Sequence, residues 1–155
     1  MQIDEKQKFS IIIADDSHAE IELLRVVCSN LNLIDEIHTV YNGQELLDFL
    51  KHTSNNRNNL PDLVLLDLNM PRMSGKEALK AIKSDNDLAH IPVIIMSSSS
   101  RKEDIFECYR NHCNSYIIKP MRLDEFQEII SQIQKFWFTC AVLPTKDRGN
   151  FYEKI

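Results

Sequence analysis

The chain has 155 residues, of which 43% are hydrophobic and 26% are charged, and its formal net charge is −5. This length suits one globular domain, and no run approaches the roughly 20 apolar residues that a membrane-spanning helix needs. The absence of a dense basic run argues against a nucleic-acid partner, and the polar N-terminus has no apolar signal-peptide core. We therefore expect a cytoplasmic protein that contacts neither a membrane nor nucleic acid.

Apolar segments and helical segments alternate along the chain, which predicts a doubly wound α/β fold with a five-stranded parallel sheet covered on both faces. Most of the apolar segments are nearly continuous runs of leucine and β-branched residues, as expected for strands that are buried on both faces. The expected strands are Phe9–Ala14, Ile37–Tyr41, Leu63–Leu66, Val93–Met96 and Tyr116–Ile118.

The segments between the strands carry apolar residues at helical spacing and begin at residues that commonly cap helices. The expected helices begin after Ser17, near Gly43, after Ser74, after Ser100 and near Leu123. Ser100 is expected to cap the fourth helix, and the last helix extends through Trp137. We place the domain at residues 9–138, between an N-terminal tail at 1–8 and a C-terminal tail at 139–155.

Polar side chains follow four of the expected strands at the points where these strands end. Asp15 and Asp16 follow the first strand, Asp67 the third, Ser97 the fourth and Lys119 the fifth. In a doubly wound sheet the carboxyl ends of the strands form the ligand crevice, so these groups should converge. Crowded carboxylates repel each other unless a divalent cation neutralises them or some stay protonated. Because Mg²⁺ prefers oxygen ligands and commonly accompanies phosphate, the pattern predicts a site of phosphoryl transfer.

The order and spacing of these residues resemble the receiver domain of two-component response regulators. The resemblance runs from Phe9 to about Trp137 and is carried by Asp15-Asp16, by DLNMP at 67–71 with Gly75, by Ser97, and by YxxKP at 116–120. It implies a flavodoxin-like sheet with strand order 2-1-3-4-5 and five helices. It also implies that a sensor histidine kinase transfers a phosphoryl group to Asp67, with Mg²⁺ as the cofactor.

The resemblance assigns a role to each residue of the predicted pocket. Asp67 is the nucleophile that forms an aspartyl phosphate. Asp16 binds Mg²⁺ directly and Asp15 binds it through water, while Asp67 and the backbone carbonyl of Asn69 supply further oxygen ligands. Lys119 holds the phosphoryl oxygens, and in the family a cis bond to the following proline aims this lysine into the pocket. The alternative interpretation is that the acidic residues only cap helices and loops.

Two further positions match the switch residues of the family. Ser97 corresponds to the hydroxyl residue that moves to bond the phosphoryl group, and Tyr116 to the aromatic residue that then turns inward. The alternative is an inert serine in a serine run and a simple aromatic residue at a strand edge. Asn69 and Ser99 stand where the family tunes loss of the phosphoryl group, and their small polar side chains predict a moderate lifetime.

The fourth helix ends differently from the family pattern. The family often has Gly-Ala there, where glycine serves a left-handed helix cap. This chain has His112-Cys113 instead, preceded by Asn111 as a possible cap. We therefore expect a changed helix end on the face that the family uses for output.

About 18 residues follow Trp137, too few for an effector domain, so we expect a single-domain regulator that acts by docking to a partner. The bulky run Phe136-Trp137-Phe138 and the Asn-rich segment at 52–59 are similar to stand-alone regulators paired with bacterial phytochrome kinases. Those regulators dimerise through the fourth helix, fifth strand and fifth helix, and we expect phosphorylation to switch this face here. The bulky run itself predicts an oligomer interface, and the alternative is that it packs under the C-terminal tail.

Two other functions compete with this interpretation. A Mg²⁺-dependent phosphatase also uses an aspartate nucleophile and a lysine, but it carries a second acid two residues after the nucleophile, where this chain has Asn69. A flavin or nucleotide binder is disfavoured because the chain has only three glycines and no glycine-rich phosphate loop. We therefore expect no enzymatic activity beyond self-phosphotransfer and autodephosphorylation.

Overall fold

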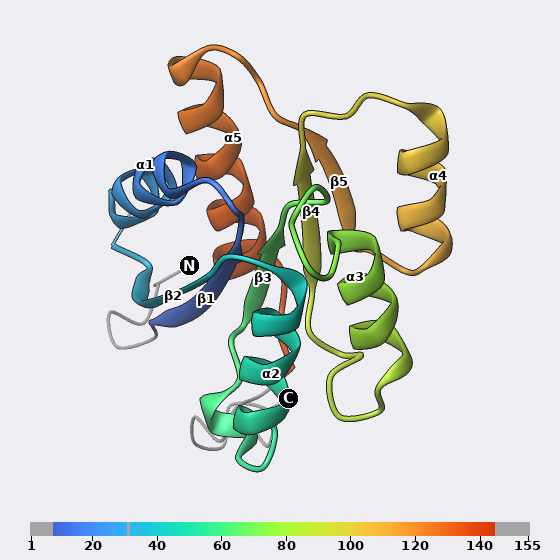
Figure 1. The fold of residues 1–155 in the computed structure, drawn as a ribbon. Coiled ribbons are helices and arrows are strands. Elements are labelled where there is room, and N and C mark those ends of the chain that lie inside the picture. The colour runs from blue at the N-terminus through green and yellow to red at the C-terminus, as the bar shows by residue number, and fades with distance from the viewer. Residues whose placement is uncertain (1–7, 31, 145–155) are drawn as a thin grey trace.

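A computed structural model describes residues 8–30 and 32–144 of the chain. Within these residues, five parallel strands form one sheet in the order β2-β1-β3-β4-β5, with helices on both faces (Figure 1). This order confirms the predicted doubly wound, flavodoxin-like architecture. The strands are β1 (Phe9–Ala14), β2 (Ile34–Val40), β3 (Leu63–Leu66), β4 (Val93–Ser97) and β5 (Ser115–Ile118).

Helices α1 and α5 pack together on one face of the sheet, and α2, α3 and α4 lie side by side on the other (Figure 1). A short 3₁₀ turn, η1, precedes β3, and a π-helical turn, η2, follows α5. None of the helices in the described part of the chain is long and apolar enough to span a membrane. The helices are α1 (His18–Ser29), α2 (Gly43–Thr53), η1 (Arg57–Asn59), α3 (Gly75–Ser84), α4 (Lys102–Arg110), α5 (Leu123–Lys135) and η2 (Phe136–Cys140).

The central strand β1 is buried on both faces, because successive side chains of a strand point to opposite sides. Ile11 and Ile13 join a core that α1 and α5 complete, whereas Ile12 and Ala14 join a second core with α2, α3 and α4. All four side chains are at most 1% exposed. This double burial explains why Ile11 to Ala14 form a continuous apolar run rather than an alternating pattern.

The edge strand β2 begins at Ile34 instead of the predicted Ile37. The prediction was wrong because the first part of this strand is polar, and Asp35 and Glu36 are exposed. Backbone pairing of Ile34 with Phe9 of β1 extends the strand where the apolar pattern gives no signal. The other predicted strand ends agree with the structure to within one residue.

Side-chain caps position the starts of three helices. Ser17, Asn42 and Ser74 each accept a hydrogen bond from the backbone N–H three residues later, at 3.3, 2.9 and 3.2 Å. The cap predicted at Ser17 is confirmed, and Ser74, after which the third helix was expected, also caps its helix. The cap predicted at Ser100 is wrong, because Arg101 is the residue before α4 and makes no side-chain cap bond.

The end of α4 is a Schellman cap formed without glycine. His112 donates its N–H to the Tyr109 carbonyl and Cys113 donates to the Cys108 carbonyl, both at 3.0 Å. Asn111 is the C-cap, and His112 takes the left-handed conformation with φ 66°. A residue with a side chain pays roughly 1–2 kcal/mol to adopt that conformation. The helix end therefore differs from the family pattern in backbone strain at His112, while its hydrogen bonds are those of an ordinary Schellman cap.

The bulky run after α5 divides between core and surface. Phe138 is 6% exposed and stacks on Phe9 with ring centroids 4.5 Å apart, whereas Phe136 is 54% exposed. The prediction of one interface cluster is therefore wrong for Phe138, because β1 covers its ring. Of the predicted tails, residues 1–7 and 145–155 lie outside the described residues, so the expected domain limits stay predictions.

Gly75, the first residue of α3, has a packing role. A Cβ atom there would lie 2.0 Å from the Asp67 carbonyl oxygen and 2.7 Å from the Leu68 Cα, both backbone atoms. We expect Gly75→Ala to lower the free energy of unfolding by about 3 kcal/mol, since the backbone must move to relieve the overlap.

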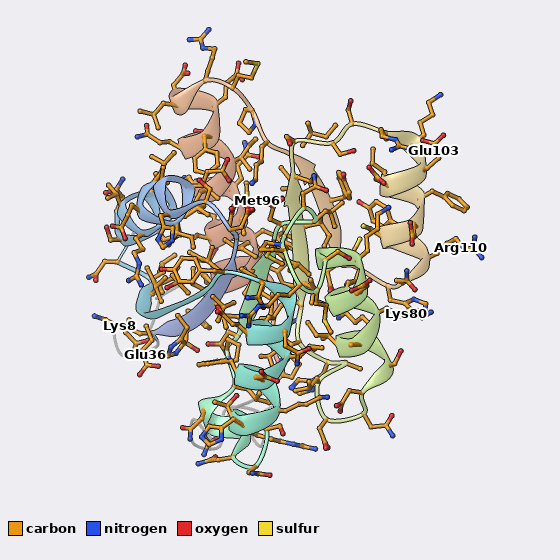
Figure 2. The ribbon with its side chains drawn as sticks, in the orientation of Figure 1. Lys8, Glu36, Lys80, Met96, Glu103 and Arg110 are labelled. Carbon is orange, nitrogen blue, oxygen red and sulfur yellow. The ribbon has the colours of Figure 1, made fainter. Side chains whose placement is uncertain are left out.

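Thermal denaturation followed by circular dichroism measures this effect. Lys80→Ala is the control, because Lys80 is exposed on the same helix (Figure 2). A Gly75→Ala protein as stable as the Lys80→Ala protein would contradict the packing role.

Candidate functional site

The predicted polar residues converge at the carboxyl end of the sheet. In the strand register Ala14 pairs with Leu66, so the next residues of the two chains, Asp15 and Asp67, emerge side by side. The carboxylates of Asp15, Asp16 and Asp67 each place an oxygen within 4.8 Å of the others. Asp15 is 2% exposed and Asp67 is 8% exposed, while Asp16 faces solvent.

Backbone hydrogen bonds hold these residues in place. Asp15 N–H donates to the Val40 carbonyl at 3.1 Å, and Asp67 N–H donates to the Ala14 carbonyl at 2.9 Å. The pairing between strands thus continues for one residue past each strand end. Asn69, the predicted backbone ligand, lies exposed in the loop that follows.

Lys119 brings an ammonium group into this acidic cluster. Its Nζ lies 2.5 Å from Glu20 Oε2, 3.0 Å from Asp15 Oδ2 and 3.7 Å from Asp67 Oδ1. Its backbone N–H donates to the Ser97 carbonyl at 2.8 Å. The cis bond that the resemblance implied before Pro120 is not observed, since every peptide bond among the described residues is trans. Lys119 thus contacts the acidic residues with a trans bond to Pro120.

Glu20 was missed by sequence reasoning. It stands three residues after the cap Ser17, where a glutamate normally belongs to a capping box, so its position gave no signal of a pocket residue. The side chain contacts Lys119 from the first turn of α1. The carboxylates of Asp15, Glu20 and Asp67 therefore lie next to the Lys119 ammonium, and Asp16 adjoins Asp15 and Asp67.

The crowding of carboxylates shifts the pKa values of the site. Burial raises the pKa of Asp67, Lys119 opposes this, and the nearby charge of Asp15 adds to it. The hydrogen bond with Asp15 and then burial raise the pKa of Glu20 against the influence of Lys119. Burial alone would lower the pKa of Lys119, but the contacts with Glu20, Asp67 and Asp15 outweigh it and raise that pKa. The pocket therefore favours an added positive charge.

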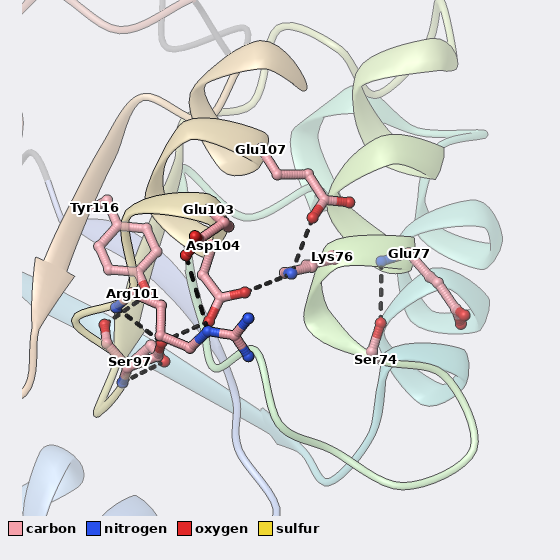
Figure 3. A network of polar contacts seen from close by, with 10 residues as sticks. Ser74, Lys76, Glu77, Ser97, Arg101, Glu103, Asp104, Glu107 and Tyr116 are labelled. Carbon is pink, nitrogen blue, oxygen red and sulfur yellow. Dashed lines mark hydrogen bonds and ion pairs between the residues drawn. The ribbon is translucent and has the colours of Figure 1, made fainter.

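Ser97 and Tyr116 meet at Ser99, in the loop between β4 and α4 (Figure 3). The fully buried Ser97 accepts the Ser99 N–H on its Oγ at 3.1 Å. Tyr116 donates its hydroxyl to the Ser99 carbonyl at 2.8 Å, and its ring packs against the core beneath α2, α3 and α4. Tyr116 thus lies on the edge strand β5, with its ring packed against the core and its hydroxyl bonded to the loop after β4.

A second polar network holds this loop from the other side (Figure 3). The Ser99 hydroxyl donates to Asp104 Oδ2 at 2.5 Å, and Lys76 Nζ lies 2.6 Å from Asp104 Oδ1 and 2.9 Å from Glu107 Oε2. Hydrogen bonds from Lys76 and Ser99 lower the pKa of Asp104. Lys76 on α3 thereby fixes both α4 and the Ser99 side chain, a contact that no local sequence pattern predicts.

We expect Lys76→Met to loosen this loop. The change keeps the apolar stem but leaves Asp104 without its ammonium partner, which should cost about 1 kcal/mol for a partly exposed pair. Amide hydrogen exchange of Ser99 and Arg101, whose N–H groups bond Ser97 Oγ and Ser99 Oγ, should accelerate about fivefold.

The matched control is Lys80→Met, one turn further along α3 and exposed to solvent (Figure 2). Equal exchange rates for these two amides in the two variants would show that Lys76 does not hold the loop.

The comparisons with known proteins agree with this geometry. Residues 11–131 match the model of the response regulator receiver domain family. The chain is 31% identical over 135 residues to the response regulator Rcp1 of Synechocystis sp., covering 86% of this chain and 92% of Rcp1. It is 30% identical over 135 residues to the probable methanogenesis regulatory protein FilR2 of Methanothrix harundinacea, covering 87% of each protein.

Solved structures resemble the fold closely. The phosphorylated cyanobacterial phytochrome response regulator RcpA has a TM-score of 0.83 and 37% identity, covering 89% of this chain and 99% of RcpA. The Mn²⁺-bound form of Rcp1 has a TM-score of 0.79 and 30% identity, covering 88% of this chain and 99% of that one. By sequence and by fold, the chain belongs to the response regulator receiver domain family of two-component systems.

Proposed function

We propose that the chain is a single-domain response regulator that stores a signal as a phosphoryl group on Asp67. The observation that carries the proposal is the position of the Asp67 carboxylate, whose side chain is 10% exposed and whose Oδ1 lies 3.7 Å from Lys119 Nζ. A buried carboxylate has little hydration to lose before it attacks phosphorus. The lysine is near enough to turn toward the group that is transferred.

The phosphoryl donor in this proposal is a phosphohistidine of a sensor histidine kinase. A carboxylate oxygen of Asp67 forms a bond to phosphorus while the bond from phosphorus to the histidine nitrogen breaks. That nitrogen keeps the electron pair of the broken bond. Lys119 and the Ser97 hydroxyl donate hydrogen bonds to the phosphoryl oxygens, where negative charge gathers during transfer.

The acidic residues fit a hard divalent cation, because three carboxylates approach one another within 4.8 Å. We assign Mg²⁺ to this place, with Asp15, Asp16, Asp67 and the backbone carbonyl of Asn69 as ligands or water-mediated partners. The Mn²⁺-bound form of Rcp1 supports a divalent cation. When bound, the ion neutralises the carboxylates and withdraws charge from the phosphoryl oxygens.

Ser97 and Tyr116 are the proposed switch. Both contact Ser99, one through its N–H and the other through its carbonyl. A movement of the Ser97 side chain toward the phosphoryl group would remove the acceptor of the Ser99 N–H and shift this peptide. This shift would change the hydrogen bond from the Tyr116 hydroxyl to the Ser99 carbonyl. A local charge on Asp67 could in this way change the balance between two arrangements of the loop and Tyr116.

The proposed output is dimerisation and partner binding through the face formed by α4, β5 and α5. Several large exposed apolar side chains lie on this face, and a gathering of such side chains is typical of an interaction surface. The likeness to the phytochrome response regulator RcpA supports a phytochrome-type sensor kinase as the partner. The exposed apolar residues there are Phe106, Tyr109, Ile118, Met121 and Leu123.

Incubation with acetyl phosphate and Mg²⁺ tests the phosphoacceptor directly. Intact-mass measurement should show one phosphoryl group per chain in the wild type and in Asp48→Asn, an exposed control on α2. Asp67→Asn, and the wild type with a chelator, should gain none. An unmodified wild type would overturn the proposal, and sustained hydrolysis of phosphomonoesters would favour the phosphatase alternative.

Sedimentation of the phosphorylated sample tests the output face. The wild type should form a dimer that Phe106→Ser weakens about tenfold, as loss of an apolar interface anchor does. Val26→Ser is the matched control, because Val26 is 61% exposed on α1 and Phe106 is 65% exposed on α4. A wild type that stays monomeric with and without the phosphoryl group would contradict dimerisation.

A further inference from the structure

The closest partner of Lys119 is a glutamate from α1 and not the proposed phosphoacceptor. Lys119 Nζ lies 2.5 Å from Glu20 Oε2 and 3.0 Å from Asp15 Oδ2, both hydrogen-bond distances. Its separation from Asp67 Oδ1, 3.7 Å, is too long for a hydrogen bond. The ammonium is therefore held on the α1 side of the pocket, away from the carboxylate that it would have to serve.

The local structure of α1 leaves the Glu20 carboxylate available for this contact. In a capping box the glutamate would accept the N–H of the cap residue, here Ser17. That N–H donates instead to Asp15 Oδ1 at 2.9 Å. The equivalent glutamate of α2, Glu45, turns back along the chain and accepts the Tyr41 N–H at 2.8 Å. Glu20 points to Lys119 because its capping role is already filled.

The exposures of the three carboxylates decide which one Lys119 can release. The side chains of Asp15 and Asp67 are 3% and 10% exposed, whereas that of Glu20 is 41% exposed. Glu20 can therefore regain hydration after it separates from Lys119, and an ion pair with one exposed partner is weak. The contact is strong enough to place the lysine and weak enough for a dianionic phosphoryl group to break.

We propose that Glu20 is a positioning residue that binds the Lys119 ammonium group while Asp67 is unphosphorylated. Glu20 then competes with the phosphoryl oxygens for this ammonium group. The inference rests on the proposed function, because the competition needs a phosphoryl group on Asp67. The Glu20 contact stabilises the unphosphorylated chain. Once Asp67 is modified, Lys119 leaves Glu20, and the freed carboxylate turns into solvent. Glu20 thus sets the concentration of phosphoryl donor that is needed to phosphorylate Asp67.

The first test measures whether the contact exists, with no phosphoryl donor present. The unfolding equilibria of wild type, Glu20→Gln, Lys119→Gln and the double variant form a double-mutant cycle, measured with a chelator. The two changes should be coupled by a factor of about three to five in the folding equilibrium constant, as for a partly exposed ion pair. The control cycle pairs Lys119→Gln with Glu22→Gln, since Glu22 is 76% exposed and lies 3.9 Å from Arg25. The control cycle should show no coupling.

The second test measures the competition. The acetyl phosphate concentration that gives half phosphorylation with Mg²⁺ should fall about three- to fivefold in Glu20→Gln, the factor that the lost contact is worth. Glu22→Gln makes the same charge change on the same helix and should match the wild type. Glu20→Asp keeps the charge but shortens the side chain, so it should behave like Glu20→Gln if the contact matters.

The outcomes distinguish failure of the Glu20 inference from failure of the proposed phosphorylation of Asp67. Absence of coupling between Glu20 and Lys119 would overturn the inference, as would coupling without any change in the donor concentration. A Glu20→Asp protein that matches the wild type would also overturn it, because charge alone would then account for the effect. Failure of the wild type to become phosphorylated would instead overturn the proposed function, and the double-mutant cycle would still report the contact.

Discussion

The organisation of this domain depends on an excess of negative charge at the carboxyl end of its sheet. Asp15, Asp67 and Glu20 lie next to the ammonium of Lys119, Asp16 adjoins two of these acids, and Asp15 and Asp67 are almost completely buried. Charges in such a place interact more strongly than in water because little solvent screens them. The strands create this situation, since their pairing fixes Asp15 beside Asp67 and no side-chain rotation can separate them fully. The proposed Mg²⁺ would neutralise this excess of negative charge, and the proposed phosphoryl transfer to Asp67 depends on that neutralisation.

The loop after β4 connects that charge to the distant face of the molecule. Ser99 bonds Ser97 on the pocket side, Tyr116 on the β5 side and Asp104 on the α4 side. A displacement at Ser97 therefore has a short covalent and hydrogen-bonded route to α4 and β5, the elements that expose apolar side chains. Lys76 stiffens this route from α3. The contacts of Ser99 thus connect the charged strand ends to the proposed output face.

Much of this could be predicted from the sequence, because strand burial and helix capping are local patterns. The apolar runs placed four of the five strands closely, and the polar residues after β1, β3 and β5 were correctly expected to converge. The start of β2 was wrong because backbone pairing, not side-chain pattern, extends an exposed edge strand. Glu20 and Lys76 were missed because contacts over 99 and 28 residues of sequence leave no periodic trace. Phe138 was assigned to the surface because its partner, Phe9, comes from the opposite end of the domain.

The stability of Asp67→Asn against the wild type, measured with a chelator and with Mg²⁺, tests whether Asp67 lies in a site with excess negative charge. Burial raises the pKa of Asp67 above its unfolded value, so the folded chain holds that proton more tightly, and its ionisation destabilises the fold as pH rises. At neutral pH with a chelator, Asp67→Asn should therefore melt at a higher temperature than the wild type. This difference should vanish below about pH 4, where the unfolded carboxyl is also protonated, and Mg²⁺ should stabilise the wild type more than the variant. A variant that is less stable at neutral pH, or a wild type indifferent to Mg²⁺, would contradict this excess of negative charge.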